Sequence, residues 1–394
     1  MSLNSVVSAE RLHIGFFGLR NVGKSSLVNA VTGQKLSLVS DVKGTTTDPV
    51  SKAMELLPLG PVVIIDTPGI DDEGDLGLMR VERAKQTLSK IHIAVLVTNA
   101  KNQLTDAENE LISTFREKRI PFIIAKNKAD LLDEIPNQKE NELYVSATNR
   151  ININELKEKI AALAKNVANN KKILADLIKK GDKAVLVVPI DDSAPKGRLI
   201  LPQQQTIREL LEIGAITTVV KPEELKAALD EFKTQPSLVI TDSQSFGEVS
   251  STLPENIPLT SFSILFARYK GDLERVVEGA FALDSLKDGD TLLISEGCTH
   301  HRQCKDIGSV KIPDWVRAHT GKKLNFEFTS GGEFPEDPSK YALIIHCGGC
   351  MLNEREMQSR LERAEKAGVP ITNYGTAIAH IHGILKRSIE PFKK

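Results

Sequence analysis

One stretch decides the fold of the first part of the chain: HIGFFGLRNVGKS, residues 13–25. The apolar run at residues 13–17 predicts a buried strand, and residues 26–31 after the stretch predict a helix. The order G-x-x-x-x-G-K-S between them is typical of a loop whose backbone N–H groups close around phosphates at a helix N-terminus. We therefore expect a nucleotide-binding α/β domain, with Lys24 on the β- and γ-phosphates and Ser25 on Mg²⁺. The expected phosphate-loop residues are Gly18, Asn21, Val22, Gly23, Lys24, Ser25 and Ser26.

A second motif, D-x-x-G, follows the apolar run at residues 62–65. Its carboxylate, Asp66, can support the magnesium shell, and the N–H of Gly69 can sense the γ-phosphate. Lys24, Ser25, Asp66 and Gly69 are therefore expected to act together in hydrolysis.

Two further motifs select the base. The apolar run at residues 122–125 leads into the order N-K-x-D, and the next apolar run leads into Ser-Ala. A carboxylate such as Asp130 accepts hydrogen bonds from both N1–H and the 2-amino group of guanine, a donor pair that adenine lacks. The sequence therefore predicts guanine recognition. The expected base-loop residues are Asn127, Lys128, Asp130, Ser146 and Ala147.

The four motifs in this order resemble the translation-factor class of GTPases. Residues 44–48, Gly-Thr-Thr-Thr-Asp, further resemble the switch of the tRNA-modification and ribosome-assembly GTPases. That resemblance implies that Thr46 meets Mg²⁺ in the GTP state and that Asn21 helps to bind K⁺. A plainer alternative for Asn21 is that it only caps the loop.

Residues 34–48 and 70–84 are the expected switch segments, which γ-phosphate and Mg²⁺ would order. Ile70 follows the D-x-x-G motif, where Ras-like proteins carry a water-orienting glutamine. We therefore expect slow hydrolysis of GTP to GDP, accelerated by K⁺ rather than by an arginine finger.

Length and composition limit the remaining possibilities. A chain of 394 residues exceeds one ordinary core and predicts two or three domains. The 51 basic and 52 acidic residues give a net charge of −1, and aromatic residues are only 5%, which argues against a nucleic-acid binder. The first residues show no signal-peptide pattern and no apolar run is long enough to span a bilayer, so the expected compartment is the cytoplasm, with no membrane partner.

Three of the four cysteines fall into one pattern with two histidines. The order is C-x-H at residues 298–300 and H-C-x-x-C at residues 346–350. Such thiolates and imidazoles can hold either zinc or an iron–sulfur cluster, and the spacing alone does not choose between them. Cys304 could be a fourth ligand or an unrelated thiol.

Strand and helix patterns alternate after the first domain, which predicts mostly parallel sheets covered by helices. Apolar runs at residues 291–295 and 342–345 directly precede the two halves of the cysteine–histidine pattern. If these strands are neighbours, the thiolates meet at one sheet edge, where ligands of parallel sheets bind. The expected domains are residues 8–168, 175–260 and 261–394.

The order of a GTPase, a small α/β domain and C-x-H…H-C-x-x-C resembles the [FeFe]-hydrogenase maturation GTPases over essentially the whole chain. The resemblance implies a scaffold that binds a [4Fe–4S] cluster through Cys298, Cys347 and Cys350, with His300 or His346 as a possible labile fourth ligand. It also implies that the protein carries a diiron precursor, supplied by two radical S-adenosylmethionine maturases, to apo-[FeFe]-hydrogenase. The middle α/β domain would then form a homodimer, the third would bind the cluster, and GTP would modulate partner exchange.

An RNA-acting GTPase with a structural zinc site is the alternative. The near-zero net charge and the absence of a G-x-x-G loop after residue 165 argue against it. A membrane-associated metal-transport GTPase is a third possibility, and the lack of apolar spans argues against that one.

Overall fold

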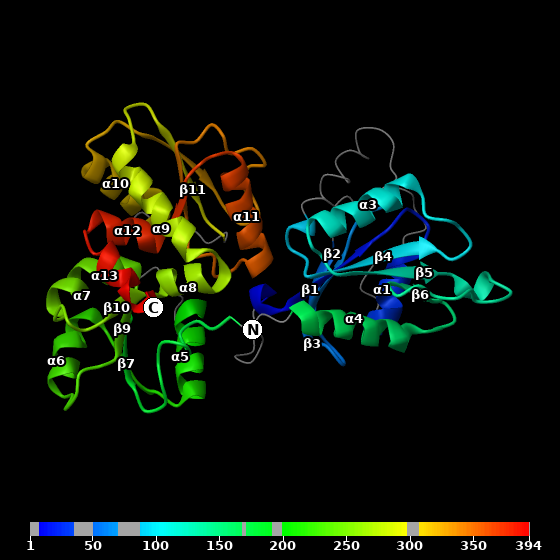
Figure 1. Cartoon of the computed structure of the whole chain (residues 1–394), viewed down its shortest axis with the longest axis horizontal. Helices are drawn as coiled ribbons and strands as arrows, with labels where there is room; N and C mark the ends of the chain where they lie inside the picture. The colour runs from blue at the N-terminus through cyan, green and yellow to red at the C-terminus, as the bar shows by residue number, and fades with distance from the viewer. Residues whose placement is uncertain are drawn as a thin grey trace. The chain divides into compact units, whose positions relative to one another are not determined.

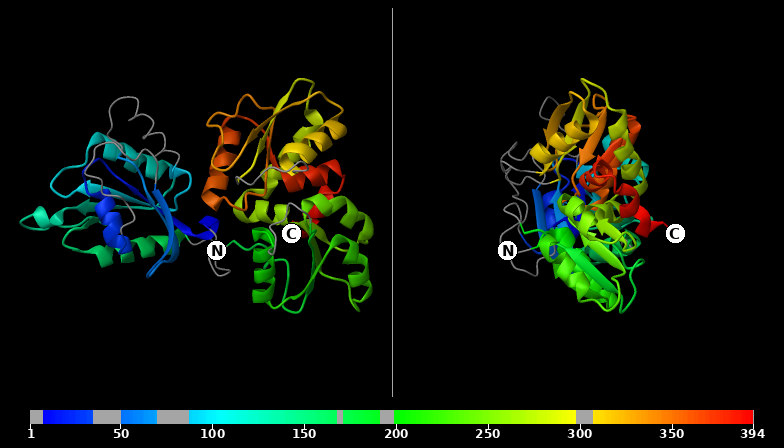
Figure 2. Two further views of the ribbon diagram at one scale, coloured as in Figure 1. Left: turned by 180° about the vertical axis from the view of Figure 1, so that it is seen from behind. Right: turned by 90° about the vertical axis from the view of Figure 1, so that its left-hand side faces the viewer.

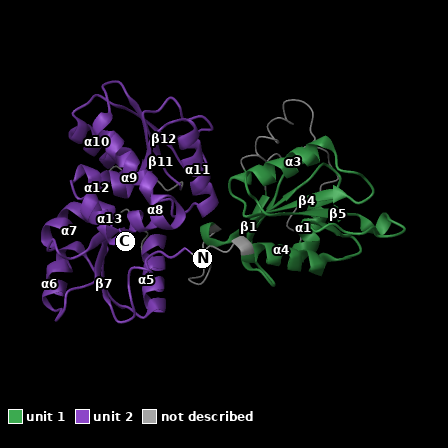
Figure 3. Cartoon of the chain, in the orientation of Figure 1, with its two compact units in different colours: residues 1–169 green, residues 170–394 purple. Residues whose placement is uncertain are grey.

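Three sheets organise the chain in this computed structural model, which describes residues 8–34, 50–69, 87–167, 171–190, 199–297 and 307–393 (Figure 1). The chain divides into two compact units, residues 1–169 and 170–394 (Figure 3). In the described residues, the first unit contains one six-stranded sheet and the second contains two four-stranded sheets. None of the described helices combines the length and the apolar character that a bilayer crossing requires.

The sheet of the first unit has the order β2-β3-β1-β4-β5-β6. The pairing of β2 with β3 is antiparallel, and all other pairings are parallel. The carboxyl ends of the parallel strands therefore meet at one edge, where the four nucleotide motifs begin. The strands are β1 (Leu12–Phe17), β2 (Val50–Leu56), β3 (Gly60–Asp66), β4 (Ile93–Asn99), β5 (Phe122–Asn127) and β6 (Glu142–Tyr144).

Helices cover both faces of this sheet, as Figure 1 shows. α1 (Lys24–Thr32) and α4 (Ile153–Val167) share a core with one set of strand residues, and α3 (Asp106–Glu117) shares a core with the alternate set. Thr105 and Glu108 form a capping box that starts α3. The predicted strands at 13–17, 62–65 and 122–125 are confirmed. The short helical turns of this unit are η1 (Ser8–Glu10) and η2 (Ala129–Leu131).

The second unit begins with an all-parallel sheet of order β10-β9-β7-β8. α5 and α8 pack on one face of this sheet, and α6 and α7 pack on the other. The strands are β7 (Lys183–Val187), β8 (Ile216–Val220), β9 (Leu238–Thr241) and β10 (Leu259–Ser261). The helices are α5 (Leu201–Ile213), η3 (Pro222–Glu224), α6 (Leu225–Asp230), η4 (Ser243–Ser245), α7 (Phe246–Thr252) and α8 (Phe262–Lys270).

The third sheet is also parallel, with the order β12-β11-β13-β14. α10 and α12 pack on one face, and α11 packs on the other. Figure 1 and the left view of Figure 2, which is seen from behind, both show β11 between α10 and α11. The strands are β11 (Thr291–Ser295), β12 (Asn325–Thr329), β13 (Leu343–His346) and β14 (Ile371–Asn373). The helices are α9 (Leu273–Phe281), η5 (Ala282–Ser285), η6 (Ile307–Lys311), α10 (Ile312–Thr320), α11 (Glu354–Lys366), α12 (Tyr374–Ile381), α13 (Leu385–Ile389) and η7 (Glu390–Phe392).

The two sheets of the second unit share one hydrophobic core. Val185 and Val239 of the β7–β9 sheet belong to the same buried cluster as Leu292 and Ile345 of the β11–β13 sheet. The domain limit that the sequence predicts between residues 260 and 261 lies inside β10, and α8 follows that strand without a linker. The second unit is therefore packed continuously across that limit.

Candidate functional site

The phosphate loop between β1 and α1 depends on its glycines. A Cβ on Gly18 would lie 2.3 Å from the carbonyl oxygen of Val97, and Gly18 has φ +157°. A Cβ on Gly23 would lie 2.5 Å from Nδ2 of Asn127, at a φ of +84°. Larger residues would therefore push the loop off the neighbouring strands.

Lys24 and Ser25 meet Asp66 across the strand ends. Nζ of Lys24 lies 2.5 Å from Oδ1 of Asp66, and Oγ of Ser25 donates to Oδ2 at 2.9 Å. The structure thus brings together three of the residues that the sequence assigned to phosphate and Mg²⁺. Gly69, three residues after Asp66, is half-buried.

The N-K-x-D motif ties the base loop to the phosphate loop. Nδ2 of Asn127 donates to the carbonyl of Val22 at 2.9 Å, and its Oδ1 accepts from the N–H of Ala147 at 3.1 Å. Nζ of Lys128 donates to the carbonyl of Asn21 at 2.7 Å. Asp130 is exposed at the start of η2, where its carboxylate can meet a base.

Asn21 itself adopts a left-handed conformation, with φ +61°. Asparagine tolerates this conformation better than most residues, and Asn21 is exposed. Thr46 lies outside the described residues, as do residues 35–48 and 70–84 of the expected switch segments, Ile70 included.

The third sheet places side by side the two strands that precede the cysteine segments. β11 and β13 are parallel neighbours, with Ser295 opposite His346, and the N–H of Cys347 donates to the carbonyl of Ser295 at 2.9 Å. The expectation that these two strands are adjacent is therefore confirmed. Cys347 and Cys350 lie just beyond this edge, and the residues that continue from β11 (Cys298, His300 and Cys304) lie outside the described residues.

Backbone N–H groups surround the sulfur of Cys347. Gly297 donates to this sulfur at 3.0 Å and Gly349 at 3.4 Å. Donors of this kind favour the thiolate form, which is the form that binds metals. Gly349 has φ +63°, a left-handed conformation that suits glycine.

Burial raises the pKa of the Cys350 thiol, and the positive charge of Lys270 opposes this shift. Nζ of Lys270 is buried beneath the loop, where it donates to the carbonyls of Cys350 at 3.1 Å and Leu352 at 2.9 Å. Lys270 is therefore a fixed positive charge at the turn that carries the second thiol.

His346 is completely buried, and the protein uses both of its ring nitrogens. Nδ1 lies 2.7 Å from the carbonyl of Cys347, so it carries the proton, and Nε2 accepts from Nη1 of Arg360 at 2.9 Å. Burial and then the charge of Arg360 lower the pKa of His346 to about 3, against the opposing bond to Cys347. Ligation of a metal by His346 would require the loss of one of these two bonds.

Arg360 is the centre of a buried network that the sequence motifs did not reveal. Its guanidinium also donates to Oγ of Ser295 at 3.3 Å, the carbonyl of Gly331 at 2.6 Å and Oε1 of Glu356 at 3.2 Å. A clue exists in the sequence, because Glu356 and Arg360 lie in the same helical stripe as the buried Met357 and Leu361. Lys270 and Arg360 together place two buried cations around the cysteine loop.

Three family models match successive parts of the chain. Residues 13–128 match the model of the 50S ribosome-binding GTPase. Residues 173–271 match the Hydrogen maturase F dimerization domain, and residues 274–391 match the Hydrogen maturase F tetramerization domain.

Individual relatives match the GTPase part. The tRNA modification GTPase MnmE of Francisella tularensis subsp. novicida is 35% identical over 165 residues, which are 39% of this chain and 36% of that protein. MnmE of Clostridioides difficile is 32% identical over 162 residues, which are 39% of this chain and 35% of that protein. The chain thus spans about a third of the length of these curated relatives.

Among solved structures, a variant of Aquifex aeolicus Era bound to GDP and AlF4⁻ is 20% identical, with a TM-score of 0.36. The match covers 53% of this chain and 92% of that one.

Proposed function

The chain belongs to the hydrogen maturase F family and is a GTPase of hydrogenase maturation; from this premise we propose that its second unit is a metallocluster scaffold. It binds a [4Fe–4S] cluster through Cys298, Cys347 and Cys350, accepts a diiron precursor, and delivers the diiron subcluster to apo-[FeFe]-hydrogenase. The observation that carries this proposal is the Cys347 sulfur, held between two N–H donors at the edge where β11 and β13 end.

The described residues fit an iron–sulfur cluster. Cysteine thiolates hold such clusters, and hydrogen bonds to their sulfurs help to set the reduction potential. A cluster with thiolate ligands brings negative charge into the protein, and the buried cations Lys270 and Arg360 offset that charge. A bound cluster would supply the iron chemistry of the site, and the protein would orient the thiols, neutralise their charge and limit access to water.

The first unit hydrolyses GTP with Mg²⁺. We assign Lys24 to the β- and γ-phosphates, and Ser25 and Thr46 to Mg²⁺. We assign Asp66 to the magnesium shell and the N–H of Gly69 to the γ-phosphate. Asp130 recognises guanine. The pairing of Lys24 and Ser25 with Asp66 supports this assignment, because it holds the proposed phosphate-binding group and the proposed Mg²⁺ ligand at the strand ends.

Potassium completes the proposed nucleotide site through Asn21. Support comes from the left-handed conformation of this asparagine in the loop, where its own carbonyl accepts a hydrogen bond from Nζ of Lys128. Hydrolysis should be faster in potassium chloride than in sodium chloride at equal ionic strength, and Asn21→Ala should remove that difference. Equal rates in the two salts for the unaltered protein would refute the potassium assignment.

The two hydrogen maturase F models name oligomerization domains, which supports a homo-oligomer. In the matched dimerization segment, β8 is an edge strand whose Ile216 and Val219 are 54% and 45% exposed. An apolar edge strand can pair with a second copy. We also assign the two radical S-adenosylmethionine maturases as suppliers of the precursor, with GTP modulating the exchange of partners.

Anaerobic iron and sulfide analysis with EPR on the reconstituted, reduced full-length protein tests the scaffold. We expect about four irons and four sulfides per chain and a reduced S = ½ signal. Cys347→Ser should lose this signal and keep GTP hydrolysis. Cys304→Ser serves as the matched thiol variant, and retention of the signal would exclude Cys304 as a ligand.

One tightly held zinc in a colourless protein that does not reconstitute would overturn the scaffold. Salt-dependent RNA binding in the same preparation would then favour the RNA-acting alternative.

A further inference from the structure

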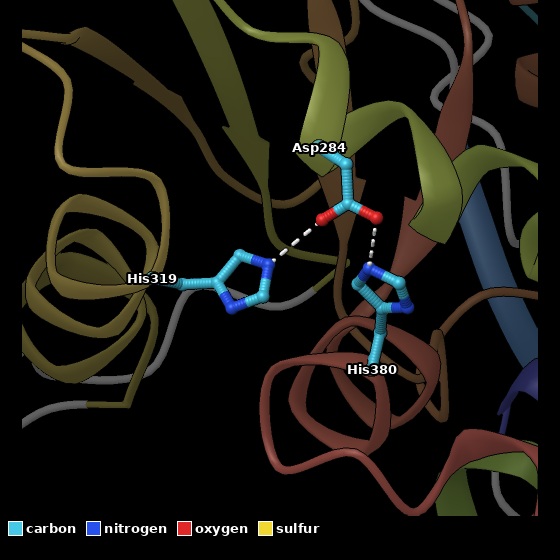
Figure 4. Close-up of side chains that lie close together, drawn as sticks. All are labelled: Asp284, His319 and His380. Atoms are coloured by element: carbon cyan, nitrogen blue, oxygen red, sulfur yellow. Dashed lines mark hydrogen bonds and ion pairs between the residues drawn. The ribbon is translucent and has the colours of Figure 1, made fainter.

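A second group of metal-binding side chains lies in the second unit, away from the cysteine loop: Asp284, His319 and His380 (Figure 4). Asp284 comes from η5, His319 from the end of α10, and His380 from the end of α12. Figure 4 shows both imidazoles turned towards one carboxylate. The sequence motifs gave no indication of this cluster, because its three members are far apart along the chain.

The distances within the cluster match those of a shared ion. Nε2 of His319 lies 2.9 Å from Oδ1 of Asp284, and Nε2 of His380 lies 3.0 Å from Oδ2. One ligand atom from each residue lies within 4.8 Å of the other two. Ligand atoms bound at about 2.0–2.2 Å to one ion are themselves roughly 3 Å apart, so small rotations would let all three bind a single ion.

The surrounding structure holds the side chains in place while leaving one side open. The ring of Phe281 packs edge-on against His380, with centroids 5.2 Å apart, and the two imidazoles pack edge-on at 5.5 Å. His380 is 13% exposed at its side chain, whereas Asp284 is 55% exposed. An ion could therefore enter from solvent and retain open coordination positions.

Both imidazoles interact with the carboxylate of Asp284. Hydrogen bonds from His319 and then from His380 hold the pKa of Asp284 below its usual range, although burial opposes this effect. As a ligand, this carboxylate would supply negative charge and oxygen donors beside the nitrogen donors of the two imidazoles.

We propose that Asp284, His319 and His380 form a site for a divalent transition-metal ion of the Zn²⁺ or Fe²⁺ type, separate from the cysteine site. Imidazole nitrogens suit these ions, and two histidines with one carboxylate are the ligand set of non-haem Fe²⁺ sites with open positions. Mg²⁺ and Ca²⁺ prefer oxygen ligands and should not bind here.

Zinc binding to the full-length, nucleotide-free protein tests the proposal, with a competing chelator to set the free Zn²⁺ concentration. The double variant His319→Gln/His380→Gln should lose one equivalent of zinc, or bind it at least about 100-fold more weakly, because loss of a group that only hydrogen-bonds to a ligand already changes metal affinity by about 10–100-fold. The matched control is His382→Gln, whose ring packs near Trp315 and which lies two residues from His380. It should bind as the unaltered protein does.

Two measurements separate this site from the thiolates. Co²⁺ at the proposed site should give a spectrum of nitrogen and oxygen ligands without thiolate charge-transfer bands, and the double variant should lose only that component. Anomalous diffraction from zinc-soaked crystals of the unaltered protein needs no variant and should place an ion between the three side chains. Unchanged stoichiometry in the double variant, or anomalous peaks only elsewhere, would overturn the proposal.

Discussion

The nucleotide site and the cysteine site both lie at the carboxyl ends of parallel strands, but the chain builds them in different ways. At the first, residues 18–25 carry their own glycines and their own helix. At the second, the surroundings of Cys347 and Cys350 come from β11, α8 and α11. A site made from a continuous loop is visible as a motif, and one made from distant elements is not.

The two sites also handle positive charge differently. Lys24 has Asp66 as its partner, and that carboxylate can turn towards Mg²⁺ when a nucleotide binds. Arg360 instead donates to four different residues inside the second unit. We infer that the first site is built to exchange its ligand and the second to keep a charge in place.

The largest expected effect tests that inference at Arg360. Arg360→Met keeps the volume and removes a donor from His346, Glu356 and the carbonyl of Gly331. Removing one member of a buried charged pair should destabilise the second unit by about 3–5 kcal/mol. Fluorescence of Trp315, the single tryptophan, reports chemical unfolding of this unit.

GTP hydrolysis by Arg360→Met should stay normal while iron retention falls. Arg363→Met is the matched control, because Nη1 of Arg363 makes only a long hydrogen bond of 3.4 Å to the carbonyl of Phe334 within the described part of the chain. An unfolding midpoint equal to that of the control would mean that Arg360 does not hold the second site together.

Lys24→Ala should have the opposite effect to Arg360→Met: GTP hydrolysis should fall while iron is retained. Loss of the ammonium group should slow GTP hydrolysis on the order of 10²–10³-fold, as the loss of one preorganised donor to a developing negative charge does elsewhere. Iron content should remain that of the unaltered protein, and the exposed Lys101→Ala should change neither quantity. A fall in iron in the Lys24 variant would contradict the separation of the two sites.

Asp130→Asn tests the base loop with a smaller expected effect. Exchanging one charged acceptor for an amide should weaken GTP binding by roughly 10–100-fold, since hydrogen bonds to charged groups contribute about 1.5–3 kcal/mol. Xanthosine triphosphate should then compete better than GTP. Asp133→Asn, also exposed and three residues further along, is the control, and equal base preference in both variants would remove Asp130 from base recognition.

The same contrast explains what the sequence could predict. The phosphate and base loops were predicted residue by residue, because each motif prescribes its own backbone. β4 and α3 carry no motif and were not predicted. The roles of Arg360 and Lys270 were not predicted either, because a charged side chain on a helix is usually exposed.

His346 shows a further limit of sequence reasoning. Its spacing to Cys347 indicates a ligand, yet only the fold shows that Arg360, fourteen residues later, contacts its second nitrogen. Likewise, η5, α10 and α12 must pack before Asp284, His319 and His380 can meet.

The smallest effect concerns the approach of Gly297 to the cysteine loop. A Cβ at this position would lie 2.7 Å from Cγ of the buried Leu352, so Gly297→Ala should shift that side chain and cost about 1–3 kcal/mol. The same contact should displace the backbone at residue 297. Because the N–H of Gly297 donates to the sulfur of Cys347, this displacement should also weaken iron binding. Leu352→Ala removes the obstructing atoms at its own cavity cost.

A double-mutant cycle separates the two costs. If the steric contact is the cause, Gly297→Ala/Leu352→Ala should be more stable than the sum of the single changes by at least about 0.5 kcal/mol, measured by Trp315 fluorescence during unfolding. Coupling here would show that the cysteine site depends on close packing between loops from different strands, which the nucleotide loop achieves within one motif. Strict additivity would mean that Gly297 acts only through its own backbone.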